Sequence, residues 1–572
     1  MMEDQLTQAY ADLLDGTYDC VDRIVLNAYF RSGHIAGGFR NWWRRLHGSD
    51  TDLDDSHLMR MAGRFARRLR GYCEKQGIPV IDCQRGARKH EIARPYLPED
   101  PAFTGLFLVL VARASAPTWH VEQTKDGRIR NLERKYAYIN HFYFHIMDPD
   151  WGHVTIRMAG HPPFGAQVIL NGHEYVSRRA EKMGITFNKT GNCFTDIIGT
   201  SNGQQPAVTR CSTSILGPTQ TVEGPNLAQI AETVCSQNIV GQLRQVCDRW
   251  LYSACLCFVL PLADQQASSF EYSYSVFQME YSHNLLFGNP GQLETCFQGM
   301  IDRTRTRLDI KRLKTIFGRK RRPYRHGGHK QPREEIVIER PTYDLTIFKV
   351  HFGAMTVKLY TKDRALLRAE AIVHNTKGLP YGRALDAFPT IANHLRETLV
   401  RFLDQLVAVD QCALSDDEFD TVAAPGQLGP RRTTGIDLNK PRMRAVLEAV
   451  VALSVLPNGF AASDVANKVC EILDMPSSDY LPRHASYDLR KLRGKQWMNR
   501  IGNSRRYQAS PDGLRIMAAL VLLRDKIIKP VLAGAGKPRR GPKPKNTHPI
   551  DGLYREMESL MRSLFLELGF AF

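Results

Sequence analysis

The most regular pattern of apolar and polar positions lies in the last third of the chain. Apolar residues recur at helical spacing in Pro441–Leu456, Ala462–Leu473 and Arg483–Trp497. Residues Met498–Gln508 alternate instead, on either side of a turn at Gly502-Asn503-Ser504, which predicts a β-hairpin. Three helices followed by a hairpin are the order of a winged helix-turn-helix, a fold that grips duplex DNA in many proteins and binds other proteins in some.

The third of these helices and the hairpin are strongly basic. Between Leu481 and Gln508, eight residues are Lys or Arg and only Asp488 is acidic. Because apolar residues take one face of the helix, the cations project from the other face, as in a recognition helix. The Pro-rich basic segment Gly536–Lys545 resembles an AT-hook, with non-specific phosphate contact and a plain linker as the two alternatives. We expect DNA contacts from Tyr487, Arg490, Lys491, Arg493, Lys495, Arg500, Asn503, Arg505, Arg506, Arg539 and Arg540.

The start of the chain predicts a mixed α/β unit. Thr104–Arg113 is a continuous apolar run typical of a buried strand, and Tyr136–Met147 alternates as a half-buried strand does. The helix predicted at Gly37–His47 places Trp42 and Trp43 next to two arginines. We expect this helix to bury one indole and to expose the other.

A second unit follows from about residue 225. After two helical segments, Tyr272–Leu286, Thr342–Val350, Met355–Tyr360 and Leu366–His374 predict strands, and the Gly/Pro-bearing segment Ala423–Arg432 predicts a linker. The expected fold class is α+β and multidomain, with two mixed α/β units followed by a C-terminal winged helix-turn-helix. The expected boundaries are 1–224 for the N-terminal α/β domain, 225–422 for the central helical and antiparallel-sheet domain, 423–439 for the linker, 440–533 for the winged helix and 534–572 for a basic linker with an amphipathic tail helix.

The charge of the chain narrows its expected partners. The 572 residues include 77 Lys or Arg and 59 Asp or Glu, a formal net charge of +18. This excess favours a polyanion, with nucleic acid before an anionic membrane surface. No apolar run reaches the length of a membrane helix, and the start lacks the pattern of a secretory signal. We therefore expect a cytoplasmic protein that binds duplex DNA and has no membrane partner.

Residues that suit phosphate chemistry recur on three predicted strands. Glu280 lies on the first strand, Lys358, Tyr360 and Lys362 lie two apart on the second, and Glu370 lies on the third. Side chains two apart share one face of a strand. Carboxylates at this face could bind Mg²⁺ or Mn²⁺, a lysine could neutralise a phosphate, and Tyr360 could be a nucleophile. Cross-strand ion pairs on a solvent-exposed face would give the same pattern.

A histidine-rich stretch predicts a divalent-metal site. His141 and His145 are four apart on a predicted strand, which places both on one face, and His173 and Glu174 follow further along the chain. Neutral imidazoles and carboxylates are metal ligands. Hydrogen-bonded histidines on a half-buried strand explain the same residues without a metal. No glycine-rich phosphate loop or dinucleotide signature occurs, so we expect no nucleotide cofactor.

The tract Lys358–Lys362 followed by Leu367–Glu370 resembles one shared by a group of uncharacterised bacterial proteins. Those proteins also carry a segment like Leu170–Glu174 and a C-terminal winged helix, and the resemblance covers most of the chain. It implies the winged helix but no activity, because none is established for that group. Over this tract alone the chain is also similar to replication initiators of phages and plasmids, which implies cleavage of a DNA strand.

These features predict a DNA-binding protein of a mobile or replicating genetic element. In this interpretation it is a metal-dependent nuclease or nickase, whose winged helix finds the site while the preceding units act on the strand. A non-enzymatic transcriptional regulator or accessory factor is the alternative. An RNA-binding protein whose sheet stacks bases is a further alternative, distinguished by a preference for single-stranded RNA.

Overall fold

The computed structural model describes residues 4–195, 227–307, 335–339, 347–410 and 414–524, apart from positions 85, 127, 128, 353, 364 and 457, together with short pieces between 552 and 563. Contacts divide the chain into two compact units. Unit 1 comprises residues 1–2, 12–293 and 315–399, and unit 2 comprises residues 3–11, 294–314 and 400–572. Each unit is described by itself.

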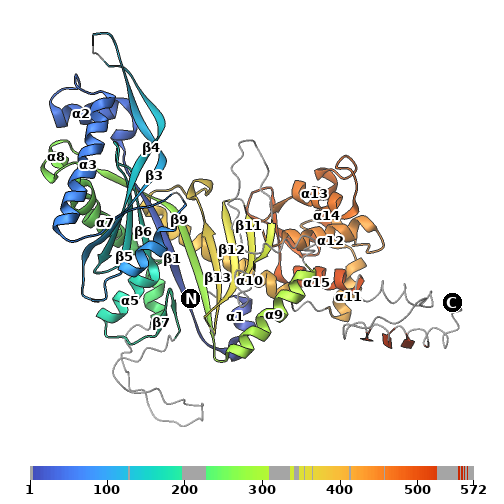
Figure 1. The fold of residues 1–572 in the computed structure, drawn as a ribbon. Helices are drawn as coiled ribbons and strands as arrows, with labels where there is room; N and C mark the ends of the chain where they lie inside the picture. Colours follow the sequence, from blue (N-terminus) through green and yellow to red (C-terminus); the bar gives the residue numbers. More distant parts are fainter. Residues whose placement is uncertain are drawn as a thin grey trace, which may run out of the picture. The chain divides into compact units, whose positions relative to one another are not determined.

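An eleven-stranded sheet forms the body of unit 1 (Figure 1). Neighbouring strands are antiparallel, except for the parallel pair β2 and β3. Strand β9 lies between β1 and β13, so strands expected in two separate domains belong to one sheet. The order across the sheet is β10 (Glu335–Glu339), β11 (Ile347–Phe352), β12 (Met355–Lys362), β13 (Leu366–Val373), β9 (Tyr272–Phe287), β1 (Leu14–Phe30), β6 (Ala166–Asn171), β5 (Gly152–Ala159), β4 (Ile129–Asp148), β3 (Gly105–Gln123) and β2 (Val80–Asp82).

Strand β1 is the middle of this sheet, and the sequence analysis does not predict it. It runs for 17 residues and pairs with β6 on one side and β9 on the other. Most of its positions from Tyr18 to Phe30 are buried, including Asp19 and Asp22, each 3% exposed. Acidic residues at buried positions interrupt the apolar pattern, so periodicity does not reveal this strand.

Helices cover the long strands of unit 1. Helices α2 (Ala36–His47) and α3 (Asp55–Lys75) lie beside β3 and β4 (Figure 1). Both indoles of α2 are buried, with Trp42 2% and Trp43 0% exposed. The prediction of one exposed indole is wrong, because Trp42 packs against Phe270 and Trp43 against His57. The other helices of this unit are α4 (Lys89–Ala93), α5 (Gly172–Lys182), α6 (Leu227–Thr233), α7 (Ile239–Trp250) and α8 (Leu262–Ala267).

Unit 2 is mainly helical and contains two small antiparallel sheets, β14-β15 and β16-β18-β17. Helices α12 (Pro441–Leu453), α13 (Ala462–Leu473) and α14 (Pro482–Gly494) lie within a few residues of the three helices that the sequence predicts. Two long helices, α9 (Pro290–Arg307) and α10 (Phe388–Asp410), contribute residues to both units. The remaining elements are α1 (Gln5–Ala9), α11 (Asp416–Ala423), β14 (Gly426–Leu428), β15 (Arg431–Thr433), β16 (Phe460–Ala461), β17 (Met498–Arg500), β18 (Arg506–Ala509) and α15 (Pro511–Leu522).

The segment expected as a linker, 423–439, contains β14 and β15, and both strands contact α14. The approach is close: a Cβ atom on Gly426 would lie 2.5 Å from the carbonyl oxygen of Gly494. This segment is therefore packed within unit 2. The basic segment Gly536–Lys545, with the predicted DNA contacts Arg539 and Arg540, lies outside the described residues.

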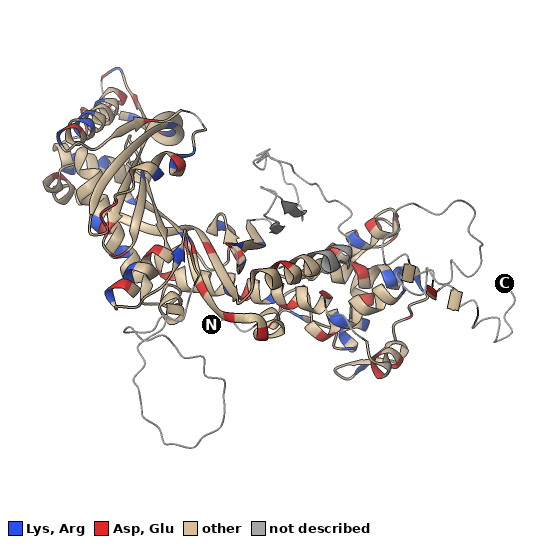
Figure 2. Ribbon diagram, turned by 60° about the horizontal axis from the view of Figure 1, so that its bottom comes forward, with Lys and Arg blue, Asp and Glu red and all other residues tan. Residues whose placement is uncertain are grey.

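Charge is concentrated on the helices. Figure 2 shows Lys, Arg, Asp and Glu along their outer faces, whereas the strands of the large sheet are mostly neutral. For the residues that the structure describes, no helix combines the length and the apolar character that crossing a bilayer requires. Among the charged side chains buried within the sheet, Asp22, Arg368 and Glu370 belong to the site described next.

Candidate functional site

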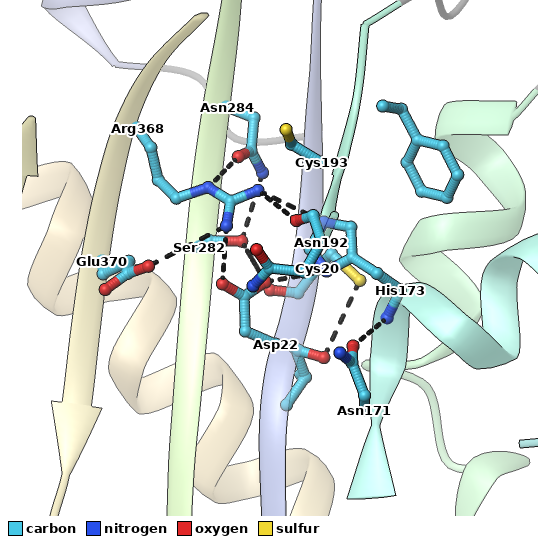
Figure 3. A network of polar contacts seen from close by, with 12 residues as sticks. Cys20, Asp22, Asn171, His173, Asn192, Cys193, Ser282, Asn284, Arg368 and Glu370 are labelled. Carbon is cyan, nitrogen blue, oxygen red and sulfur yellow. Dashed lines mark hydrogen bonds and ion pairs between the residues drawn. The ribbon is translucent and has the colours of Figure 1, made fainter. Parts of the chain in front are cut away.

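The centre of the candidate site is a buried ion pair between Asp22 on β1 and Arg368 on β13. Arg368 has no exposed surface and Asp22 is 3% exposed. Nη1 of Arg368 lies 2.9 Å from Oδ2 of Asp22, across the intervening strand β9 (Figure 3). Burial disfavours the charged form of Asp22, but the charge of Arg368, with a further effect of the neighbouring His173, outweighs burial, so the pKa of this carboxyl lies below its ordinary value.

The start of helix α5 brings His173 to this ion pair. The Asn171 side chain caps the helix by accepting a hydrogen bond from the His173 backbone N–H at 2.9 Å. Position 172 must be small, because a Cβ atom on Gly172 would lie 1.9 Å from the carbonyl oxygen of Val21. The close approach leaves Nδ1 of His173 2.9 Å from Oδ1 of Asp22. Burial lowers the pKa of His173 despite this neighbour, which favours the neutral imidazole at pH 7.

The remaining donors of Arg368 are also used. Its Nε donates to Oδ1 of Asn284 at 2.6 Å, and its Nη2 donates to the carbonyl oxygen of Asn192 at 2.8 Å. The Ser282 hydroxyl donates to Oδ1 of Asp22 at 2.9 Å. A buried charge is tolerated only when its hydrogen bonds are satisfied in this way. The network therefore fixes β1, β9 and β13 relative to one another.

Four of the five residues predicted to be catalytic lie on β12 and β13, at the edge of this network. Glu370 is 4% exposed and accepts hydrogen bonds from the Tyr360 hydroxyl and, at 3.1 Å, from Nζ of Lys358. Nη1 of Arg368 lies 3.9 Å from the same carboxylate. Lys362 donates to the Asn192 side chain rather than to Glu370. The pairing of Lys358 with Glu370 is the cross-strand ion pair considered above, although the carboxylate is buried rather than exposed.

Glu280, the fifth predicted residue, lies on the neighbouring strand β9. Its carboxylate accepts a hydrogen bond from Nε2 of Gln278 at 2.9 Å. Burial, followed by the negative charge of Glu370, raises the pKa of Glu280. Two carboxylates thus lie near enough to repel, beside the ammonium group of Lys358. A divalent cation or a phosphate ester bound at this edge would meet groups of suitable charge.

Tyr360 is held as a protonated phenol. Burial and then the adjacent Glu370 carboxylate raise its pKa above the ordinary value. Its hydroxyl points to Glu370, which could receive the proton if the oxygen attacked an electrophile. Burial also lowers the pKa of Lys362, with the charge of Arg368 as the next cause. The edge of the network therefore holds a phenol and a carboxylate in direct contact, with two lysines close by.

The two histidines predicted as a pair on β4 lie in different surroundings. Nδ1 of His145 lies 2.9 Å from Nε2 of His153 on β5, and burial, with a smaller effect of His153, lowers the pKa of His145 to about 3. His141 lines a separate cavity, where burial and then Arg157 lower its pKa to about 4. Within the described residues, neither histidine belongs to a cluster of three side chains that could hold a metal ion.

His173 and Glu174, the other predicted ligands, contact different partners. Glu174 forms an ion pair with Lys189 at 2.5 Å, whereas His173 belongs to the Asp22 network. Ligand atoms of Cys20, Asp22 and His173 do lie within 4.8 Å of one another. However, Asp22 is already neutralised by the ion pair described above, and burial raises the pKa of Cys20 well above its ordinary value. This trio suits a structural network better than a metal ion.

A second cationic surface lies on unit 2, where α14 presents one face to solvent. Arg483, Tyr487 and Arg490 are exposed and follow one another at intervals of four and three, so they share this face. Tyr487 is 50% exposed, and Nζ of Lys491 lies 5.1 Å from the centre of its ring. Lys491 is also 3.7 Å from the buried carboxylate of Asp488. The exposed face thus combines two arginines with an aromatic ring.

The hairpin β17–β18 carries the other predicted contacts. Asn503 and Arg505 are exposed at its turn. Arg500 donates to a carbonyl of the same turn, and Arg506 donates to the carbonyl oxygens of residues 458 and 459 at 2.8 and 2.9 Å. Arg500 and Arg506 therefore brace the hairpin, while Arg505 is left at its tip.

Two further predicted DNA contacts have protein partners. The guanidinium of Arg493 lies 5.9 Å from the ring centre of Tyr507, and Nζ of Lys495 donates to the carbonyl oxygen of Thr421. These contacts leave the exposed arginines of α14 and of the hairpin tip as the cations that a ligand meets first.

Residues missed by the sequence analysis include Asp22, Ser282, Asn284 and Asn192. The sequence feature nearest to these residues is the Asn-Gly-His segment at 171–173. Its glycine is needed because a Cβ atom there would collide with the backbone of Val21. Comparison of the chain with protein-family models, with curated proteins and with solved structures gave no match. The functional assignment therefore depends on the geometry of this chain alone.

Proposed function

We propose that the C-terminal part of unit 2 is a winged helix and that the chain binds duplex DNA through it. The order α12, β16, α13, α14, β17, β18 and the sheet order β16-β18-β17 support this proposal. The observation on which it rests is the exposed face of α14, with Arg483, Tyr487 and Arg490, together with Arg505 at the hairpin tip. Among the described residues, Arg490 and Arg505 have no ion pair with a carboxylate.

The helix that presents this face is firmly anchored. Asp488 has no exposed surface and accepts a hydrogen bond from the Tyr480 hydroxyl at 2.9 Å and from Nη2 of Arg442 at 3.1 Å. Arg442 belongs to α12, so the buried carboxylate ties α14 to the first helix of the module. A rigid helix presents its side chains without a further cost of ordering the backbone on binding.

In the binding mode that we propose, α14 enters the major groove. Arg490 then contacts base edges or the phosphates that flank them, and Tyr487 contacts the backbone or a thymine methyl group. Arg505 at the hairpin tip reaches the adjacent minor groove. Arg493, braced on an aromatic ring, lies closer to the hairpin and contributes long-range charge.

The variant Arg490→Gln/Arg505→Gln tests this proposal. A lost arginine contact costs on the order of 1–3 kcal/mol, so the double variant should bind duplex DNA at least tenfold more weakly. Fluorescence anisotropy of a labelled duplex at fixed salt measures the change. The matched control is Lys440→Gln/Lys468→Gln, which removes two cations of the same unit that already pair with Asp437 and Glu471.

The control should bind within about twofold of the parent, because exposed ion pairs at a distance contribute little. If duplex binding weakened equally in the two double variants, only the net charge of the unit would matter. That result would contradict the proposal that the winged helix binds the duplex. Unchanged duplex binding in Arg490→Gln/Arg505→Gln would do the same.

The contact between Tyr360 and Glu370 favours a second function, cleavage of a DNA strand on a replicating or mobile element. The Tyr360 oxygen would attack a backbone phosphorus while its proton passes to Glu370. The displaced sugar oxygen would take a proton from water, leaving a phosphotyrosyl link. Lys358 would offset phosphate charge, and Glu280 with Glu370 would hold Mg²⁺ or Mn²⁺.

The substitution Tyr360→Phe separates this activity from folding, because it removes one hydroxyl and keeps the ring. Cleavage of a labelled single strand in the presence of Mg²⁺ should fall by at least a hundredfold, with duplex binding unchanged. Tyr272→Phe, which removes another buried hydroxyl from a strand of the same unit, is the control. Cleavage at the parental rate by Tyr360→Phe, or none by the parent with either metal, would exclude this second function.

A further inference from the structure

A large cationic cavity lies on unit 1, away from the network of Asp22 and Arg368. Its volume is about 1080 Å³, and strands β1, β3, β4, β5, β6 and β9 all contribute to its wall. Four arginines line it, Arg31, Arg134, Arg157 and Arg383. Three histidines also line it, and no acidic residue does.

The cavity has a charged rim and a buried floor. Arg31, Arg134 and Arg383 are exposed, whereas His141 and His161 are buried, at 4% and 6% exposed. Arg157 lies between these extremes. The three exposed guanidiniums can therefore reach a ligand at the mouth, and a group that enters deeper meets imidazoles.

These arginines have no internal counter-ion. Among the residues that the structure describes, none of the four forms an ion pair with a carboxylate. Nη1 of Arg157 has only a long hydrogen bond, 3.4 Å, to the amide oxygen of Gln167, and its Nε is buried without a partner. Nε2 of His34, on the same wall, is also buried without a partner. Unmet polar groups beside cations without a counter-ion suit the binding of an anion.

The polar lining suits a nucleotide rather than a bare anion. The side-chain amides of Asn27 and Gln167 are joined by a hydrogen bond at 3.0 Å, and both line the cavity. Amides are the groups that pair with base edges, and tyrosines such as Tyr29 offer a ring to stack on a base. Because sites for drug-sized ligands measure on the order of 300–1,000 Å³, this cavity has room for more than one nucleotide. Such contacts reach a base only when it is unpaired.

A second groove has one lining residue in common with this cavity. It has a volume of about 780 Å³ and shares His161 with the cationic cavity. Tyr136 and Tyr138 on β4 line it and are 80% and 64% exposed. They follow Arg134 of the rim on the same strand. Exposed tyrosines next to a cationic rim form the combination that stacks successive bases of a single strand.

We propose that the cationic cavity and the adjoining tyrosine groove bind a single-stranded nucleic acid, with the rim arginines on its phosphates and an unpaired base in the cavity. This site is separate from the duplex site of unit 2, since all of its residues belong to unit 1. Arginine forks match phosphate oxygens in pairs, which favours arginine over lysine at such a rim.

The test uses the full-length protein and the triple variant Arg31→Gln/Arg134→Gln/Arg383→Gln. All three side chains are exposed, so the fold should be unaffected. Anisotropy of a labelled single-stranded oligonucleotide should show at least tenfold weaker binding, and the slope of log K against log salt should fall by about 0.7 for each phosphate contact removed. Binding of a labelled duplex should change by less than twofold.

The matched control is Arg68→Gln/Arg88→Gln/Arg94→Gln, three exposed arginines of the same unit that do not line the cavity. It should bind the single strand within about twofold of the parent. Equal loss in the control, or parental binding in the rim variant, would overturn the inference. So would equal competition by inorganic phosphate or a mononucleotide at the same phosphate concentration, because either result would mean that no strand is needed.

The same titrations distinguish the two sites. Arg490→Gln/Arg505→Gln should lose duplex binding and keep single-strand binding. If that variant loses single-strand binding while the rim variant keeps it, the single-strand site is absent, whether or not the duplex proposal holds.

Discussion

At Arg368, a single side chain satisfies groups on the strands β1 and β9 and on the turn at Asn192. Its guanidinium reaches the carboxylate of Asp22, the amide of Asn284 and the carbonyl of Asn192, with none of its surface exposed. Burying an ion pair costs several kcal/mol per ion before the attraction is counted, so such a pair persists only with good geometry. The buried pair also positions Glu370, which lies two residues after Arg368 on the same strand. Glu370 in turn accepts a hydrogen bond from the Tyr360 hydroxyl.

Replacing Arg368 by methionine leaves Asp22 buried without its partner. The variant Arg368→Met should lower the free energy of unfolding by about 3–5 kcal/mol. Urea unfolding followed by tryptophan fluorescence reports mainly on unit 1, since five of the six tryptophans precede residue 251. The control Arg70→Met breaks an ion pair with Asp82 whose side chains are 47% and 67% exposed, and it should cost at most about 1 kcal/mol.

The double variant Asp22→Leu/Arg368→Met should recover part of the loss, because no unpaired charge remains. A loss in Arg368→Met no larger than in Arg70→Met would contradict the role given to the buried pair.

The sequence predicts some residues of this site and misses others for a physical reason. Lys358, Tyr360 and Glu370 could be placed together because alternation along adjacent strands is a local property. Asp22 could not, since its partner Arg368 lies 346 residues away and nothing local separates a buried acid from a surface one. The surroundings of the histidines at 141 and 145 could not be predicted, because their neighbours come from other strands, which spacing does not specify.

Among the elements, local helices were predictable and the central strand was not. Helix α13 has the predicted bounds Ala462–Leu473, because its apolar face and its start both depend on residues close together in the sequence. Strand β1 has buried acids and receives its hydrogen bonds from β6 and β9, so its stability comes from distant parts of the chain. The placement of β9 between β1 and β13 likewise follows from pairing that a single segment does not reveal.

The contact between α5 and β1 gives a prediction about an element. Gly172→Ala places a methyl group against the Val21 carbonyl and should push α5, with His173, away from Asp22. Overpacking of this kind costs about 1–3 kcal/mol of unfolding free energy. Thermal or urea unfolding measures it.

Gly241→Ala is the control, because this position lies within α7 and a methyl group there would meet no neighbouring side chain within 4 Å. Alanine there should stabilise the protein by about 0.5–1 kcal/mol. Equal effects of the two substitutions would show that the α5 contact is not as tight as described.

At the scale of the whole molecule, a chain with a net charge of +18 presents two cationic surfaces of different shape. Unit 1 holds arginines around a concave cavity, which suits an unpaired strand, and unit 2 holds arginines on a convex helix and a hairpin tip, which suits a duplex. A protein with both could hold a duplex and a strand released from it. The net positive charge would speed encounter with a duplex and with a single strand alike. The shapes of the two surfaces would determine which of the two nucleic acids each surface binds.

The measurement that tests the central claim most directly is the salt dependence of duplex binding by the parent and by Arg490→Gln/Arg505→Gln, between about 50 and 200 mM salt. If both arginines contact phosphates, the slope of log K against log salt should become shallower by about 1.8, with weaker binding throughout. Parallel lines at the same affinity would contradict the assignment of α14 and the hairpin as the duplex-binding surface.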